Sequence, residues 1–226
     1  MKTKYKLLSY IIDEKTQGYG DTPHLKINRV REISKGASNN EAVLQLAAHY
    51  GTHIDASKHF DDNGPAVTDY KINDYIFNSP LIIGCKKKKD ELITPDDLKG
   101  FGSRLKKTDI LLFKTGFYKY KGNSSYASHN PGMSPETAIM LRTDFANIRC
   151  VGIDAISISP YQNRDIGKKT HKELLRAGGY KSKPLIIIED MDLSGASLRL
   201  VKIFVIPLMI KDIDGITCTV VGEYKA

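Results

Sequence analysis

Short apolar runs recur along the whole chain, and they restrict its fold more than any other feature of the sequence. They occupy residues 6–12, 81–84, 109–113, 147–153, 184–188 and 201–209. All fall well short of the roughly 18 apolar residues that a membrane-spanning helix needs, and runs of this length are typical of buried strands. Between them, Thr94-Pro95 and Ser134-Pro135 each place a capping hydroxyl before a proline at the first helical position. The sequence therefore predicts a mixed α/β fold in a single domain spanning residues 1–226.

Local signals predict several further elements. Residues 94–100 and 171–177 predict short helices, the second ending at Gly178-Gly179, because glycine commonly follows the last helical turn. Residues 210–221 alternate around Asp214-Gly215, a dipeptide typical of a hairpin turn. Residues 41–50 are apolar and lead into a histidine-rich segment, which favours burial of that segment.

The composition favours an enzyme over a nucleic-acid-binding or membrane protein. The apolar fraction of 41% and the charged fraction of 27% are ordinary for a soluble globular chain. The net charge of +8 could attract nucleic acid, but the densest cluster, residues 86–89, runs into Asp90-Glu91 and resembles a turn. We therefore expect neither a nucleic-acid partner nor a membrane partner.

Cysteine usage and the N-terminus predict a cytoplasmic location. Cys85, Cys150 and Cys218 form no closely spaced pair, which favours reduced and partly buried thiols. The apolar stretch at residues 7–12 is too short for a targeting segment, and Asp13-Glu14 ends it with charge.

The segment from His49 to His59 carries the chemistry of the chain. Its alternate residues 49, 51, 53, 55, 57 and 59 are His, Gly, His, Asp, Ser and His. Alternate residues of an extended chain point to one side, so a strand or extended loop would collect three imidazoles and one carboxylate. A helix would instead separate His49 and His53 from Asp55 and His59. The spacing therefore predicts extended backbone.

These side chains match the ligand set that zinc, manganese or iron prefers in proteins. Half of the six histidines fall within these eleven residues. A single histidine is more often a hydrogen-bonded core or surface residue than a ligand. Burial of three with an aspartate would leave several polar groups in need of partners. The spacing therefore favours a metal site over a structural role.

The segment resembles the signature of the cyclase family, His-x-Gly-Thr-His-x-Asp-x-Pro-x-His, a family that includes the bacterial kynurenine formamidases. Ser57 stands at the position of the family's proline, and this change removes no ligand. The resemblance extends over most of the chain. It includes residues 21–23, 111–117, 131–134, 151–157, 171–175, 187–190, 207–208 and 214–215.

The resemblance implies a role for each site residue. The implied metal ligands are His49, His53, Asp55, His171 and Glu189. Two of them, Asp55 and Glu189, would bridge where two ions bind. His59 would donate and accept protons without binding metal directly. The implied pocket residues are Tyr19, Thr115 and Gly116.

The fold that the resemblance implies is the swivelling β/β/α type, a mixed sheet or partial barrel flanked by helices. The implied assembly is a homodimer or homotetramer with one or two zinc or manganese ions per subunit. The implied activity is hydrolysis of N-formyl-L-kynurenine to formate and L-kynurenine, a step of tryptophan catabolism. The chain contains no Trp, and Tyr19 lies in the loop where formamidases carry an aromatic that stacks on the substrate.

Other activities fit the same residues. A lactone or cyclic-amide hydrolase would use the same ligands, and a metal-dependent lyase or cyclase would use the same base for proton abstraction. A non-catalytic protein that buries its histidines, or a nucleic-acid binder, is a more distant alternative.

Overall fold

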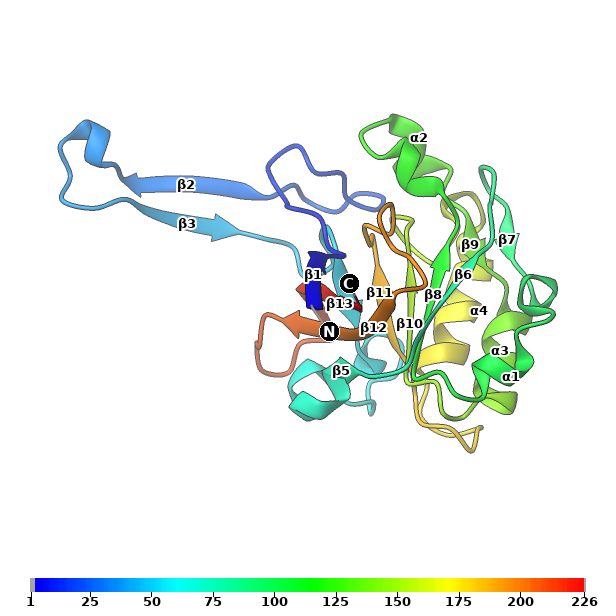
Figure 1. Ribbon diagram of the computed structural model, residues 1–226. Helices are drawn as coiled ribbons and strands as arrows, with labels where there is room; N and C mark the ends of the chain where they lie inside the picture. Colours follow the sequence, from blue (N-terminus) through cyan, green and yellow to red (C-terminus); the bar gives the residue numbers. More distant parts are fainter. Residues whose placement is uncertain (1–2, 226) are drawn as a thin grey trace.

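The computed structural model describes residues 3–225, and its centre is a nine-stranded mixed sheet (Figure 1). The strands of this sheet are β1 (Thr3–Leu7), β4 (His53–Asp55), β5 (Ile76–Phe77), β6 (Pro80–Gly84), β8 (Ile110–Lys114), β10 (Cys150–Ile153), β11 (Ile186–Glu189), β12 (Leu200–Pro207) and β13 (Gly215–Lys225). Their order is β5-β12-β13-β4-β11-β10-β8-β6, and β1 pairs with β13. Two small sheets pair β2 (Lys26–Arg31) with β3 (Glu41–Gln45) and β7 (Leu92–Ile93) with β9 (Gly132–Met133).

The helices lie mainly on one side of the sheet (Figure 1). They are α1 (Gly102–Leu105), α2 (Ser124–Ser128), α3 (Pro135–Asp144) and α4 (Arg164–Leu175). Single 3-10 turns occupy Ile33–Lys35, Ser57–His59, Val67–Asp69, Ile72–Tyr75, Pro95–Leu98, Phe117–Tyr120 and Tyr161–Asn163. Within residues 3–225, every helix is too short or too polar to cross a bilayer.

The half of the sheet formed by β6, β8, β10 and β11 is parallel and buried on both faces. Along β8, Leu111 and Phe113 face the core beneath the helices, whereas Ile110 and Leu112 face a second core on the other side. Parallel strands covered on both faces need apolar residues at every position, which explains the uninterrupted apolar run seen in the sequence.

The other half of the sheet is antiparallel and folds over the second core. Strand β4 joins the two halves, because it pairs antiparallel with both β11 and β13. In the second core, Ile188 of the parallel half packs in one cluster with Val205 and Val220 of the antiparallel half. The predicted mixed sheet in a partial barrel, flanked by helices, is therefore confirmed.

Helix α3 begins where its capping signal predicts, but α4 does not. The Ser134 side chain accepts a hydrogen bond from Thr137 N at the start of α3. Helix α4 begins at Arg164 with Asn163 as its N-cap, so the predicted start at residue 171 is wrong. Glycine weakens helix propensity, and Gly167 lies inside the missed part. This glycine is required by packing, because a Cβ there would stand 1.6 Å from Ser159 Oγ.

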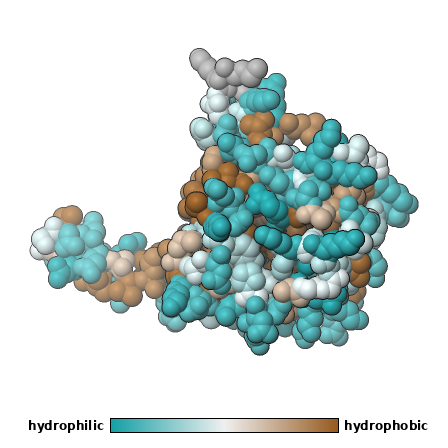
Figure 2. All heavy atoms as spheres, turned by 90° about the horizontal axis from the view of Figure 1, so that it is seen from below, coloured by the Kyte–Doolittle hydropathy of each residue, from teal (hydrophilic) through white to brown (hydrophobic). Residues whose placement is uncertain are grey.

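Two more predictions from the sequence need correction. Strand β1 ends at Leu7, so the predicted strand does not extend to residue 12. The hairpin pairs β12 with β13 through residues 208–214, and Asp214-Gly215 ends that loop instead of forming a two-residue turn. The histidine-rich segment is buried at His53 and Asp55, as predicted. Residues 41–45, in the run before it, are exposed, because they form one strand of a β2–β3 arm that projects from the body (Figures 1 and 2).

Candidate metal centre

Strand β4 brings His53 and Asp55 to the same side of the sheet. Both are buried, with His53 opposite Glu189 of β11 on one edge and opposite Thr217 of β13 on the other. The turn into β4 uses Gly51, whose φ of +62° is unfavourable for other residues. A Cβ at this position would also stand 2.3 Å from Ile12 Cγ2.

Glu189 enters the site from the end of β11. Its Oε2 lies 3.4 Å from His53 Nε2, and its Oε1 lies 3.4 Å from His171 Nε2. Oε1 also accepts hydrogen bonds from Ile158 N at 2.7 Å and from Ser157 Oγ at 3.0 Å. These two donors hold the carboxylate in place while it faces both imidazoles.

Backbone carbonyls orient two of the imidazoles toward the carboxylates. His53 Nδ1 donates to the Gly51 carbonyl at 2.9 Å, and His171 Nδ1 donates to the Gly167 carbonyl at 2.9 Å. Each Nε2 is therefore left without a proton when the ring is neutral, which is the tautomer a metal ligand needs. His171 Nε2 also lies 3.6 Å from Asp55 Oδ2.

His49 and His59 lie on the outer side of Asp55. His49 Nδ1 contacts Asp55 Oδ1 at 2.8 Å, and its Nε2 contacts Asp214 Oδ2 at 3.1 Å. His59 follows β4 in the 3-10 turn Ser57–His59, and its Nδ1 contacts the same Asp214 oxygen at 2.6 Å. The predicted extended geometry therefore holds for β4, whereas a turn positions His59.

Mutual contact shifts the protonation of these groups. Burial alone would lower the pKa of His171, but its contacts with Asp55 and Glu189 outweigh burial and raise that pKa to about 10. Burial and the Asp55 charge raise the pKa of Glu189, yet contacts with His171 and His53 lower it overall to about 2. The pKa of Asp214 is lowered by its hydrogen bonds with His49 and His59. The site therefore holds ionised carboxylates in contact with imidazole rings.

This donor set fits one or two divalent cations. His53, Asp55 and Glu189 present ligand atoms within 4.8 Å of one another, and so do His49, Asp55 and His59. The two groups share Asp55, whose carboxylate would therefore be available to both ions if two were bound. Neutral imidazole and carboxylate together suit zinc or manganese.

The site opens into a cavity of about 370 Å³. All six predicted histidine and acid residues line it, together with Tyr19, Thr22, Phe60, Ser157, Ser159, Arg164 and Lys168. The Phe60 ring stacks on His171 with 4.9 Å between the ring centroids. A single cavity is therefore lined by residues from β4, β11, α4 and the loops that flank them.

Comparison with known proteins identifies the family. The cyclase family model, described as "Putative cyclase", matches residues 7–160. A kynurenine formamidase of Geobacillus thermodenitrificans is 30% identical over 199 residues, which is 87% of this chain and 85% of that protein. The chain belongs to the cyclase family.

Further relatives agree with this placement. A kynurenine formamidase of Bacillus thuringiensis subsp. konkukian is 29% identical over 203 residues, covering 87% of this chain and 85% of its own. A solved structure described as a potential metal-dependent hydrolase with cyclase activity is 25% identical, with a TM-score of 0.73 over 100% of both chains. Isatin hydrolase A from Labrenzia aggregata shares the fold, with a TM-score of 0.84 at 18% identity over 99% of this chain and 94% of its own. Membership places the protein among hydrolases of carbon–nitrogen bonds other than peptide bonds.

Two pocket predictions for this cyclase-family protein need correction. Thr115 and Gly116 do not line the metal cavity but a separate hollow beside Lys86 and Lys119. They form a turn whose backbone N–H groups donate to the Asp154 carboxylate at 2.8 and 2.9 Å. Their resemblance to the family is therefore explained by a structural turn.

Sequence reasoning missed Asp214, Arg164 and Lys168. The local sequence predicted Asp214 only as a turn residue. Nothing near it in the chain shows that its side chain faces His59 and His49, which are 155 and 165 residues away. Arg164 and Lys168 lay in the missed part of α4. A helix predicted to start at residue 164 would have put both side chains on the same face as His171, because Arg164 and Lys168 precede His171 by seven and three residues.

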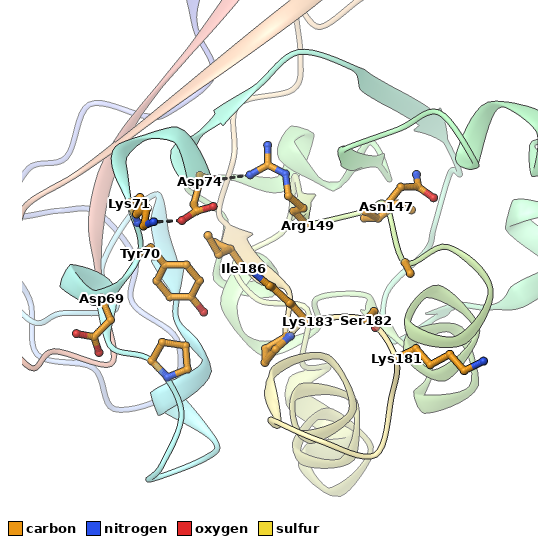
Figure 3. A pocket seen from close by; sticks show the side chains of 14 residues that line it. Asp69, Tyr70, Lys71, Asp74, Asn147, Arg149, Lys181, Ser182, Lys183 and Ile186 are labelled. Atoms are coloured by element: carbon orange, nitrogen blue, oxygen red, sulfur yellow. Dashed lines mark hydrogen bonds between the residues drawn. The ribbon is translucent and has the colours of Figure 1, made fainter.

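A larger cavity, about 620 Å³, lies beside Tyr70 (Figure 3). Its lining, drawn from within residues 3–225, contains neither histidine nor cysteine. Its two carboxylates are already engaged: Asp69 accepts from Ala66 N and Asp74 accepts from Lys71 N, at 2.8 and 2.9 Å. We refer to this space as the Tyr70 cavity.

Proposed function

We propose that this protein is a metal-dependent hydrolase of aryl formamides, which converts N-formyl-L-kynurenine and water to formate and L-kynurenine. One observation carries the proposal. The Nε2 atoms of His53 and His171 face two buried carboxylates within 3.6 Å, next to the His59–Asp214 pair. The kynurenine formamidases among its relatives support the choice of substrate.

The cation ligands in this proposal are His49, His53, Asp55, His171 and Glu189. A bound divalent cation supplies an acidified water and polarises an acyl oxygen at neutral pH. The carbonyls of Gly51 and Gly167 accept from Nδ1 of His53 and His171, which keeps the Nε2 atoms of these rings directed toward the buried carboxylates.

His59 serves as the proton carrier. Its Nδ1 donates to Asp214 at 2.6 Å, which leaves Nε2 as the atom that exchanges a proton. His59 accepts a proton from the attacking water and delivers it to the leaving nitrogen of the amide. General acid–base transfer of this kind contributes about 10²- to 10⁴-fold to a rate. Asp214 holds the ring in one orientation throughout, as a carboxylate does for the imidazole of a hydrolytic triad.

Metal analysis and turnover measured on the same preparation test the proposal. We expect one or two equivalents of zinc or manganese, and formate released in equal amount to L-kynurenine. Metal without formamide hydrolysis, but with ring opening of a lactone or cyclic amide, would move the substrate to those compounds. A protein that binds no divalent cation and hydrolyses none of them would refute the proposal.

We also infer that the protein forms a homodimer or homotetramer through the β2–β3 arm. A two-stranded hairpin without further packing is marginally stable in water. The arm nevertheless exposes apolar side chains, among them Ile33 at 58%, Val43 at 57% and Leu44 at 60%. Sedimentation velocity should show an oligomer that Val43→Asp with Leu44→Asp converts to monomer. A wild-type monomer at micromolar concentration would contradict this inference.

A further inference from the structure

One wall of the metal cavity is cationic, and helix α4 builds it. Arg164, Lys168 and His171 are spaced by four and three residues, so they lie on one face of the helix. All three line the cavity. The same face of α4 therefore presents His171 to the acidic floor and two permanent cations farther toward the helix N-terminus.

Arg164 is positioned by aromatic rings instead of by an acid. Its guanidinium carbon lies 4.4 Å from the ring centroid of Tyr161 and 5.9 Å from that of Tyr19. The two tyrosine rings meet edge to face at 5.5 Å, and the Tyr19 hydroxyl donates to Ser159 Oγ at 3.3 Å. These contacts restrict the guanidinium, and no ion pair found within residues 3–225 engages its five N–H donors.

The positive charge of Lys168 is also poorly neutralised by neighbouring carboxylates. Its nearest carboxylate is Asp165, 3.9 Å away, and the two side chains are 67% and 87% exposed. Such an exposed pair contributes little binding energy. Two less exposed lysines are instead paired closely: Lys87 contacts Asp97 and Lys121 contacts Asp190, each at 2.7 Å. The cations of α4 therefore have charge to offer a ligand.

We propose that Arg164 and Lys168 select amide substrates that carry a carboxylate, and that they bind this carboxylate at the rim while the amide lies on the floor. The inference rests on the proposed function, because it assigns the other end of that substrate. An aromatic ring between the two ends would lie near Tyr19 and Phe60, which line the same cavity. Charge-assisted hydrogen bonds from a planar guanidinium favour a carboxylate over a neutral group.

Paired substrates and a matched control test this assignment. Arg164→Gln and Lys168→Gln remove one charge each, and Arg164→Lys retains it. Lys169→Gln is the control, because Lys169 is an exposed lysine of the same helix that does not line the cavity. The kinetic substrates are N-formyl-L-kynurenine, which bears a carboxylate, and formanilide, which shares the aryl formamide but is neutral.

We expect Arg164→Gln to raise the KM for N-formyl-L-kynurenine about 10- to 100-fold, the range of one charged hydrogen bond, with kcat little changed. Lys168→Gln should have a smaller effect, because its ammonium already has Asp165 at 3.9 Å and lacks the planar fork of a guanidinium. Arg164→Lys should recover part of the loss. The kcat/KM for formanilide should change less than about twofold in every variant, as should both substrates in Lys169→Gln. Equal losses for both substrates, or equal losses in the control, would overturn the assignment.

A binding measurement separates this inference from the proposed function. L-kynurenine and aniline are titrated calorimetrically into wild type and Arg164→Gln, with and without Mn²⁺. Weaker binding of L-kynurenine alone, by about tenfold or more in either metal state, supports a rim carboxylate site even if no amide is hydrolysed. Unchanged L-kynurenine affinity in Arg164→Gln refutes the rim site, whatever the turnover of wild type.

Discussion

The metal cavity and the Tyr70 cavity lie at opposite ends of the same parallel strands. Glu189, the last residue of β11, faces the metal cavity, whereas Ile186, the first, lines the Tyr70 cavity. Likewise Ser157 follows β10 into the first cavity, and Arg149 precedes β10 in the second. The Tyr70 cavity is the larger, about 620 against 370 Å³, yet both of its carboxylates, Asp69 and Asp74, accept hydrogen bonds from backbone N–H groups.

This difference shows that donor chemistry, and not volume, identifies the reactive site. Ligand sites of open α/β sheets form outside the carboxyl ends of the strands, where loops can present side chains without interrupting the sheet. The amino ends of β10 and β11 instead receive Arg149, which donates to the carbonyls of Asp74 and Ile76 at 3.0 and 2.9 Å. The two cavities therefore predict different responses to equivalent changes.

The largest expected difference follows from removing one carboxylate charge in each cavity. Asp55→Asn should lose bound metal and reduce turnover by at least about 10⁴-fold, because Asp55 belongs to both candidate ligand groups. Asp69→Asn, the matched change in the Tyr70 cavity, should retain metal and turnover. Elemental analysis and formate release measure both. Full metal content in Asp55→Asn would contradict the ligand assignment.

The next largest effect separates proton transfer from metal binding within the metal cavity. His59→Gln should retain metal while kcat falls about 10²- to 10⁴-fold, the range of a lost general acid–base group. The matched change, Lys183→Gln, removes a titratable group from the Tyr70 cavity and should leave kcat unchanged. If His59→Gln also loses metal, His59 is a ligand and the proton carrier must be another residue.

Protons should leave the metal cavity, and not the Tyr70 cavity, when the apoprotein takes up metal. The pKa of His49 and of His171 is raised to about 10 by neighbouring carboxylates despite burial, so both rings are protonated at pH 7. Cation binding needs neutral rings, so affinity should rise with pH up to about tenfold per unit for each proton released, until pH reaches that pKa. Burial raises the pKa of Tyr70 to about 12, and it stays protonated throughout. Calorimetry in buffers of different ionisation enthalpy counts the protons, and zero release would contradict this prediction.

The smallest effect on activity is expected from Arg149→Met in the Tyr70 cavity. We expect this substitution to reduce stability and not turnover. Loss of the two carbonyl contacts, and of the guanidinium 4.6 Å from the Phe77 ring centroid, should lower the free energy of unfolding by about 1–3 kcal/mol. The kcat of the metal-loaded enzyme should remain within about twofold of wild type. Urea unfolding and steady-state kinetics measure the two quantities. Unchanged stability with reduced kcat would mean that the Tyr70 cavity supports catalysis.

Local sequence patterns predicted the structure correctly where residues close together in the chain determine the geometry. The period of two along β4 puts His53 and Asp55 on one side, and the Ser134-Pro135 capping signal starts α3. They failed where distant residues decide it. The start of α4 was missed because Gly167 is a poor helix former that only close packing on Ser159 explains.

The amino-acid sequence by itself determined the strand-forming runs, the helix caps and a segment whose ligand types and spacing favour a cation, because each depends on side chains a few positions apart. Only the tertiary structure decided which distant groups complete the site. Pairing of β4 between β11 and β13 sets Glu189 opposite His53 and carries Asp214 to His59. Such contacts depend on strand order and register, which arise when the whole sheet closes over its core, so no local pattern encodes them.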